Sequence, residues 1–492
     1  TPAVENAYVG IDAFESLAAA LAAYPSYAGP IVVNGGTYAS ADLASGAITL
    51  RLVRDLASGQ DDVTLASLSG SADDAIVTRY HDVSGANLIV ESGSFGGLIS
   101  GAGSLTKTTG GQLAISNANT YGGGTTVSGG RILLQNAGGL GAGDVTIADG
   151  PYVMLWWNTG SSTVPNNFFL NGLGATQGGE QKDTIYGNGG GAGYGEYVLS
   201  GTITLNATSN IGGNNINHVR ITGQVTGPGG LTKGGTRADE NNTLILTNPA
   251  NDYQGPTTVT KGRLQLGADE VLPHGMAAGS VTVEAGATLD LGAYDETING
   301  LSGTGTVTRS GAYSTGADGA AQISTSKNYV QLLDFGNGSG ATVNGVAFAN
   351  AGTSSTGWSL VAPNLYGESG SPTGYDQLVS DFYYNGNPGT LTFSNLTVGT
   401  TYEAVLYTKV GHWAGRPQNA TFDEDGGGPI SNQLRRTDPG TVGYYAYRFV
   451  APSPSATISM APQTAGTFHW FAASLETVTA ATHTLTVGDA NS

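Results

Sequence analysis

The sequence contains no cysteine, few basic residues and no long apolar run. The absence of cysteine from 492 residues excludes disulfides and thiolate chemistry. The chain contains 18 lysines and arginines and 37 aspartates and glutamates, which gives a formal net charge of −19. Without a basic patch, neither nucleic acid nor an anionic membrane surface is an expected partner. No apolar run approaches the roughly 18 residues that a membrane-spanning helix needs, so we expect no membrane insertion.

Glycine is abundant instead, with 79 residues, while 39% of the chain is hydrophobic and 11% is charged. The apolar residues alternate with polar ones in short runs, as at Leu113 and Ile115 or at Ile132 and Leu134. This alternation is typical of strands with one buried face, and glycine suits the tight turns between them. The composition therefore predicts an all-β protein rather than a disordered chain.

One stretch of the chain is written twice. The first copy is Gly101–Leu134 and the second is Gly227–Leu266, which carries six extra residues at Thr236–Asn241, between two expected strands. A repeat of this size, made of short strands and glycine turns, is typical of a solenoid, whose stacked coils bury faces that one unit cannot bury alone. We expect a parallel β-helix in which Val127 and Val259 point inward. When the two copies are aligned, identical residues coincide: Leu105-Thr106-Lys107 with Leu231-Thr232-Lys233, Asn119 with Asn251, Tyr121 with Tyr253, and Thr125-Thr126-Val127 with Thr257-Thr258-Val259.

The shared pattern, G-x-G-x-L-T-K followed by N-x-Y-x-G-x-T-T-V, resembles the autotransporter-associated β-strand repeat, also called the passenger-associated transport repeat. Repeats of this family occur in the β-helical stalks of large secreted and surface-attached bacterial proteins. The resemblance implies a β-helical architecture and an extracellular or cell-surface location. It implies no catalytic residues.

Residues 1–29 carry the one expected helix, with Asp12 as its N-cap, Glu15 completing a capping box and Pro25 ending it. A strand at Ile31–Val33 follows, which is similar to the start of many right-handed β-helix proteins. We expect the helix to cover the first coil, because an open coil exposes its core and its strand edges. The chain starts at Thr1 rather than Met, and we interpret it as a mature form after removal of a signal peptide.

Residues 30–325 are expected to form the β-helix. From residue 326 the strands become longer and richer in aromatic residues, which predicts an antiparallel, jelly roll-like β-sandwich over residues 326–477. The tail, residues 478–492, alternates threonines with Leu485 and Val487 and predicts one more strand. This segment folds back on the sandwich sheet, frays as a short tail, or adds to a neighbouring chain. In the last case, His483, Leu485 and Val487 are the assembly residues.

Two candidate binding sites lie in the predicted sandwich. Asp423, Glu424 and Asp425 precede a run of glycines and suit a hard cation such as calcium, and a solvated acidic turn is the alternative. Aromatic faces beside an arginine suit sugar rings, and burial in the core is the alternative for each aromatic residue. The candidate sugar-binding residues are Trp413, Arg416, Tyr383 and Tyr444.

No catalytic residues are assigned, because the six histidines are scattered and no serine-nucleophile motif occurs. Asp61-Asp62 and Asp73-Asp74, with Arg79 nearby, are the acids that a polysaccharide lyase would use, or they are solvated loop residues. We therefore interpret the chain as a non-enzymatic, extracellular structural or adhesive protein. Its expected partners are itself, in a head-to-tail polymer, or a surface glycan. A carbohydrate-binding protein and a polysaccharide-degrading β-helix enzyme are the alternatives.

Overall fold

The computed structural model of the chain divides into two compact units. A rod comprises Thr1–Asp290, Tyr294–Val307 and Leu485–Ser492, and a sandwich comprises Leu291–Ala293 and Thr308–Thr484. The structure describes residues 7–9, 30–39, 41–43, 48–54, 60–79, 87–157, 160–177, 180–181, 183–188, 195–213, 218–235, 242–292, 294–309, 312–336, 340–361, 364–367, 372–409, 418–423, 433–437, 443–462, 467–479 and 484–488.

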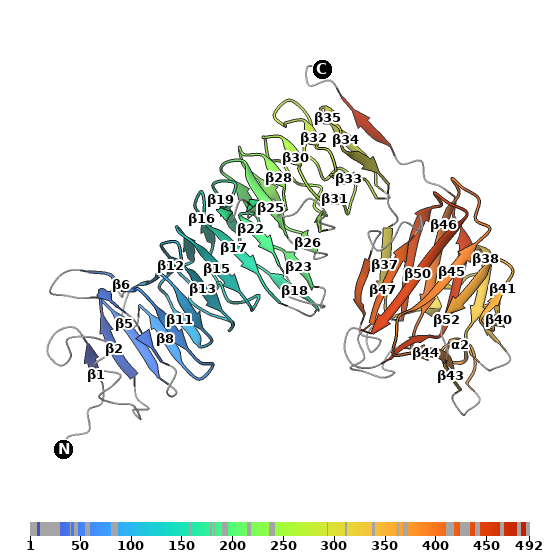
Figure 1. Cartoon of the computed structure of the whole chain (residues 1–492), viewed down its shortest axis with the longest axis horizontal. Coiled ribbons are helices and arrows are strands. Elements are labelled where there is room, and N and C mark those ends of the chain that lie inside the picture. Colours follow the sequence, from blue (N-terminus) through green and yellow to red (C-terminus); the bar gives the residue numbers. More distant parts are fainter. Residues whose placement is uncertain are drawn as a thin grey trace. The chain divides into compact units, whose positions relative to one another are not determined.

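The rod is a parallel β-helix, as predicted, and its strands stack in chain order from blue to yellow (Figure 1). A twelve-stranded sheet runs from β4 (Ala41–Asp42) to β35 (Leu301–Gly303). A nine-stranded sheet runs from β3 (Gly36–Tyr38) to β27 (Val225–Thr226). A five-stranded sheet, β1 (Ala7–Val9) to β11 (Leu98–Gly101), and a seven-stranded sheet, β18 (Gly160–Val164) to β36 (Thr306–Thr308), complete the coils.

The core of the rod is built from the alternating apolar residues of these strands. The inward positions Leu113, Ile115, Ile132 and Leu134 are all 0% exposed. Val127 and Val259 are likewise 0% exposed, which confirms the predicted inward register of both copies. Each coil therefore covers the apolar face of the coil before it.

The two repeat copies occupy different sheets of the rod. In the first copy, β12 (Leu105–Lys107) pairs with β14 (Thr125–Val127) in the nine-stranded sheet. In the second, β28 (Leu231–Lys233) pairs with β30 (Thr257–Val259) in the twelve-stranded sheet. The register is the same, since each motif lysine is opposite the valine of the next coil. The repeat therefore specifies the contact between successive coils and not one face of the rod.

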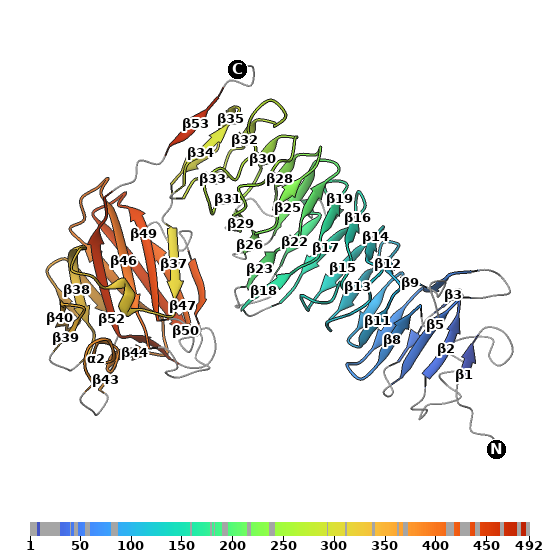
Figure 2. The ribbon, with the colours of Figure 1, turned by 180° about the vertical axis from the view of Figure 1, so that it is seen from behind.

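The sandwich consists of two main sheets, shown from behind in Figure 2. A seven-stranded sheet has the order β37-β49-β46-β52-β38-β40-β39, and a six-stranded sheet the order β41-β42-β45-β50-β47-β48. Buried aromatic residues from both sheets, among them Trp358, Tyr402 and Tyr447, form a common core between them. The pairings are antiparallel, as predicted, except that β38 and β40 run parallel. The strands used below are β38 (Asn328–Asp334), β40 (Val346–Asn350), β46 (Thr401–Tyr407), β47 (Gln418–Asp423), β49 (Tyr444–Val450) and β52 (Ala472–Thr477).

The structure corrects the predicted boundary between the rod and the sandwich. The strand β37 (Ala312–Gly316) pairs antiparallel with β49, so the sandwich begins before residue 326. Pairing with a strand far along the chain determines this boundary, and the local composition does not reveal it. At the other end, β1 pairs with β2 (Pro30–Asn34), so coil pairing begins before residue 30. The predicted cap helix, from Asp12 to Pro25, lies outside the described residues.

The tail forms a strand, β53 (Leu485–Val487), but it does not fold back on the sandwich. It pairs in parallel with β34 (Glu296–Ile298) of the rod, and Gly488 N donates to Ile298 O at 2.8 Å. The prediction that a folded-back tail would lie on the sandwich sheet is therefore wrong. An edge strand with unpaired backbone groups accepts another strand, and β34 in the last part of the rod offers such an edge.

Candidate functional site

The asparagine of each repeat copy links three successive coils. Asn119 Oδ1 accepts a hydrogen bond from Ile99 N at 2.8 Å, while its Nδ2 donates to Gly139 O at 2.7 Å. Asn251 makes the equivalent bonds, accepting from Val225 N at 2.8 Å and donating to Val271 O at 2.8 Å. These bonds satisfy backbone groups that would otherwise be buried without partners.

The tyrosine and the first threonine of the T-T-V segment form a second buried link. The hydroxyl of Tyr121 lies 2.6 Å from Thr125 Oγ1, which in turn donates to Leu140 O at 2.9 Å. Tyr253 and Thr257 repeat the hydroxyl contact at 2.6 Å. Burial raises the pKa of both tyrosines well above the usual range, outweighing the bond to threonine. They are therefore neutral hydrogen-bonding groups of the core.

The motif lysines are buried cross-links between coils. Lys107 and Lys233 are both 0% exposed. Lys107 Nζ donates to the carbonyls of Thr108, Thr109 and Gly129, the last at 3.1 Å. Lys233 Nζ donates to Gly234 O and, at 3.0 Å, to Lys261 O. Burial lowers the pKa of Lys107 to about 8, although the nearby charge of Glu91 opposes this shift.

A groove of about 330 Å³ opens on the flank of the rod beside the first repeat copy. Arg131 crosses it, donating from Nε to Gln112 Oε1 at 2.8 Å and from Nη1 to the hydroxyl of Tyr152 at 2.9 Å. A side chain at Gly130 would block this turn, because its φ is 60° and a Cβ would lie 2.1 Å from Gly111 O. The volume and the planar guanidinium suit a small polar ligand. The groove is lined by Gly110, Gly111, Gln112, Gly130, Arg131, Gly150, Tyr152 and Ala175.

Two of the acids that a lyase would use, Asp61 and Asp74, have structural roles in the rod. Asp74 is 1% exposed and accepts hydrogen bonds from Ile48 N at 3.0 Å and Ser71 N at 2.6 Å. Asp61 pairs with Arg54 at 2.7 Å near the surface. Within the described ranges, no group of three or more histidine, cysteine or acid side chains is placed to hold a metal ion.

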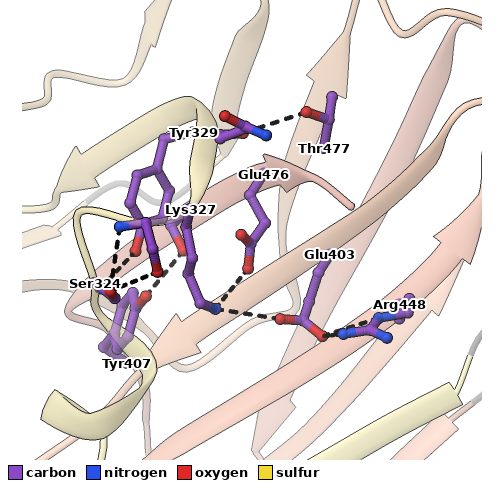
Figure 3. A network of polar contacts seen from close by, with 11 residues as sticks. Ser324, Lys327, Tyr329, Glu403, Tyr407, Arg448, Glu476 and Thr477 are labelled. Carbon is purple, nitrogen blue, oxygen red and sulfur yellow. Dashed lines mark hydrogen bonds and ion pairs between the residues drawn. The ribbon is translucent and has the colours of Figure 1, made fainter. Parts of the chain in front are cut away.

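A network of charged side chains lies on the seven-stranded sheet of the sandwich (Figure 3). Glu403 on β46 is directly opposite Glu476 on β52 and Arg448 on β49. Lys327 Nζ lies 2.5 Å from Glu476 Oε1 and 3.4 Å from Glu403 Oε2. Arg448 Nη2 is 3.0 Å from Glu403 Oε1. Strand register therefore brings Glu403, Glu476 and Arg448 together, and Lys327 joins them from the position just before β38.

The pKa values of the two carboxyl groups in this network shift in opposite directions. Burial raises the pKa of Glu476, the Lys327 ammonium opposes the rise, and the neighbouring Glu403 adds to it. For Glu403, burial opposes ionisation, but the hydrogen bond with Glu476 and the charge of Arg448 outweigh burial and lower its pKa. Of the two carboxyl groups, Glu476 therefore has the higher pKa. Both carboxyl groups are engaged by cations, because Lys327 contacts both of them and Arg448 contacts Glu403.

Few residues of the two predicted sandwich sites fall in the described part of the chain. Trp413, Arg416, Glu424, Asp425 and His483 lie outside it, and Asp423 is described only as the last residue of β47. Tyr383 and Tyr444 do not meet. Tyr383 packs against the core between the sheets, while Tyr444 packs against a separate apolar cluster that contains Phe348 and Tyr407. Of the predicted assembly residues, Leu485 is half-buried and Val487 is 50% exposed.

Sequence reasoning missed the buried lysines and the carboxyl pair. A signal for the lysines was present, because alternation in Leu105-Thr106-Lys107 puts Lys107 on the same face as Leu105. No local signal marks Glu403 and Glu476, which become neighbours only through strand pairing.

Comparison with known proteins agrees with the repeat analysis. The family model of the passenger-associated-transport-repeat matches residues 105–134 and 241–266. The chain therefore carries two matches to this repeat family, and both lie in the parallel β-helix. The chain is also similar to the Adhesin BmaC autotransporter of Brucella suis biovar 1 (strain 1330), at 30% identity over 189 residues. This match covers 38% of the chain but only 4% of that adhesin.

A solved structure, the enzymatically active domain of bacteriophage CBA120 tailspike protein 4, is similar to this chain. The alignment covers 95% of this chain and 66% of the tailspike chain. The identity is 10% and the TM-score 0.20, so this likeness carries no argument about fold or activity. No helix among the described residues is long and apolar enough to cross a membrane.

Proposed function

We propose that this chain is part of an exported bacterial surface protein and has a structural and adhesive role without enzymatic activity. The observation that carries the proposal is the identical use of the motif residues in both copies. In each copy, the asparagine and the lysine bond one coil to the next, and the tyrosine bonds the threonine four residues on, so the repeat builds a rod. The printed name of the similar Brucella protein, an adhesin, supports the adhesive part of the proposal.

A surface glycan is the proposed ligand. The groove at Arg131 offers a guanidinium and a tyrosine hydroxyl, which are groups that hydrogen-bond sugar hydroxyls and carboxylates. Trp413 and Arg416 of the sandwich remain the second predicted contact. The structural bonds of Asp74 and the ion pairs of Glu403 and Glu476 favour binding over catalysis at the acidic positions.

Beads coated with the full chain should adhere to some members of a panel of polysaccharide-coated surfaces, and the free chain should compete. If the groove binds the glycan, Arg131→Gln weakens adhesion while Arg54→Gln, a change at a surface ion pair, leaves it intact. If the sandwich binds it, Trp413→Ala has the larger effect. Beads that adhere to no surface of the panel, or hydrolysis of any polysaccharide by the chain, would contradict the proposal.

We propose, as a second role, that the tail strand links chains into polymers. The specific observation is that β53 adds in parallel to the edge of β34, where Leu485 is opposite Glu296 and Val487 is opposite Ile298. The same three-residue pairing with β34 of a second chain would join two copies, and repetition of an open contact gives a filament.

Deletion of Thr484–Ser492 should abolish polymers and leave the melting temperature of the monomer within a few degrees, because β53 contributes only three paired residues. Light scattering over a concentration series and negative-stain electron microscopy measure both states. Filaments that persist after the deletion, or a full chain that is monomeric at every concentration, would exclude the tail as the connector.

A further inference from the structure

Two carboxyl groups outside the sites described so far are buried in the sandwich. Asp334 is the last residue of β38, and Asp381 directly precedes β44 (Phe382–Asn385). Asp334 is 3% exposed and Asp381 is 6% exposed. Carboxylates are rarely buried to this extent unless a cation, a proton or several donors compensate them.

The two carboxyl groups lie near each other around Gly336. A Cβ added to Gly336 would lie 2.1 Å from Asp381 Oδ2 and 2.2 Å from Asp381 Oδ1, so the backbone after Asp334 packs directly against this carboxyl group. Burial raises the pKa of Asp334 to about 7, and the charge of Asp381 contributes to the rise. The pair is therefore close enough for mutual repulsion.

The side chain of Asp334 is also not fully hydrogen-bonded. Its Oδ1 is buried and has no hydrogen-bond partner. The lysine and arginine that form the described ion pairs of the sandwich, Lys327 and Arg448, are engaged with Glu403 and Glu476. An unpartnered buried carboxylate oxygen with a second buried carboxyl group nearby is an arrangement that a bound cation would stabilise.

Neutral oxygen ligands are available beside the pair. Asn350 on β40 is in register with Asp334, and its Nδ2 donates to Gly336 O at 3.1 Å. Asn350 is exposed, so the position is reached from solvent. Calcium accepts about six to eight oxygen ligands from carboxylates, carbonyls, amides and water, and it tolerates irregular geometry.

We propose that Asp334 and Asp381 bind one divalent cation of the calcium class. The carbonyl of Gly336, the side-chain amide of Asn350 and water would supply the remaining oxygen ligands. This site is distinct from the acidic turn Asp423–Asp425 and does not depend on the adhesive role. Its function would be to fix β38 and the segment before β44 to each other.

Calcium chloride titrated into the chelator-treated full chain, followed by isothermal titration calorimetry, tests the site. We expect one saturable site in the wild-type chain that is lost in Asp334→Asn and in Asp381→Asn. Asn has nearly the same shape as Asp, and circular dichroism verifies that each variant is folded. Asp423→Asn is the matched control and should bind calcium as the wild type does.

A third variant keeps the test decisive if the buried substitutions unfold the sandwich. Asn350→Ala changes an exposed residue and should weaken calcium binding about tenfold. Three results would overturn the proposal: no saturable binding by the wild-type chain, unchanged binding by Asp334→Asn, or loss of binding in Asp423→Asn alone. The last result would assign calcium to the acidic turn. A metal-free Asp334→Asn chain that is more stable than a non-binding wild type would show that the pair holds a proton instead.

Discussion

Replacing Ile132 by Asp should lower the free energy of unfolding of the rod by about 3–5 kcal/mol, because a carboxylate would enter a dry core without a partner. Ile132 is 0% exposed on β15 (Arg131–Leu134). Its neighbours in the adjacent coils are Leu113 and Val153, so no polar group is in register to receive the charge. Chemical denaturation of the full chain, followed by circular dichroism, measures the loss.

The same substitution at Val127 should be less damaging. Val127 is equally buried, but its neighbour in the preceding coil is Lys107, whose ammonium can compensate a new carboxylate. Thr126→Asp is the control for the substitution itself, since Thr126 lies on the outward face of the same strand and is only half-buried. Losses of equal size at Ile132 and Thr126 would contradict the assigned register. A larger loss at Val127 than at Ile132 would contradict the compensating role of Lys107.

The rod could be predicted from the sequence because its rule is local. Each strand buries alternate residues, and each strand pairs with its equivalent about one coil away, so Leu113, Ile115 and Val127 could be assigned inward without knowledge of the whole fold. The same rule applies to Lys107, which shares the inward face of Leu105. The alternating pattern places the Lys107 side chain in the core, and backbone carbonyls of Thr109 and Gly129 accept hydrogen bonds from its ammonium group.

The sandwich sites could not be predicted, because pairing between distant strands creates them. The sequence around Glu403 contains no signal that Glu476 or Arg448 lies beside it, and the sequence around Asp334 contains none for Asp381. The tail presents the same difficulty. The alternation of residues predicted the strand at Leu485–Val487. It could not predict the partner strand β34, because pairing depends on which distant strand edge is available.

Lys107→Met and Lys233→Met should each lower the free energy of unfolding of the rod by about 2–3 kcal/mol, because backbone carbonyls would remain buried without a donor. Methionine preserves most of the unbranched apolar stem, so the loss reports mainly on the ammonium. An apolar replacement also removes the cost of burying a charge, which limits the loss. The lost bonds are those to Gly129 O at 3.1 Å in the first copy and to Lys261 O at 3.0 Å in the second.

A pH profile distinguishes the ammonium from simple packing. Because the pKa of Lys107 is lowered to about 8 in the folded chain, the unfolded chain binds more protons above this pH. The Lys107 contribution to stability therefore rises with pH from about 8 toward the ordinary lysine pKa of about 10.4, and Lys107→Met should lack this rise. Lys261→Met is the matched control, since Lys261 accepts the Lys233 bond through its backbone and its own side chain is only half-buried. Equal effects at Lys233 and Lys261 would show that the Lys233 ammonium does not hold the coils together. An unchanged profile in Lys107→Met would show that burial does not lower the pKa of Lys107.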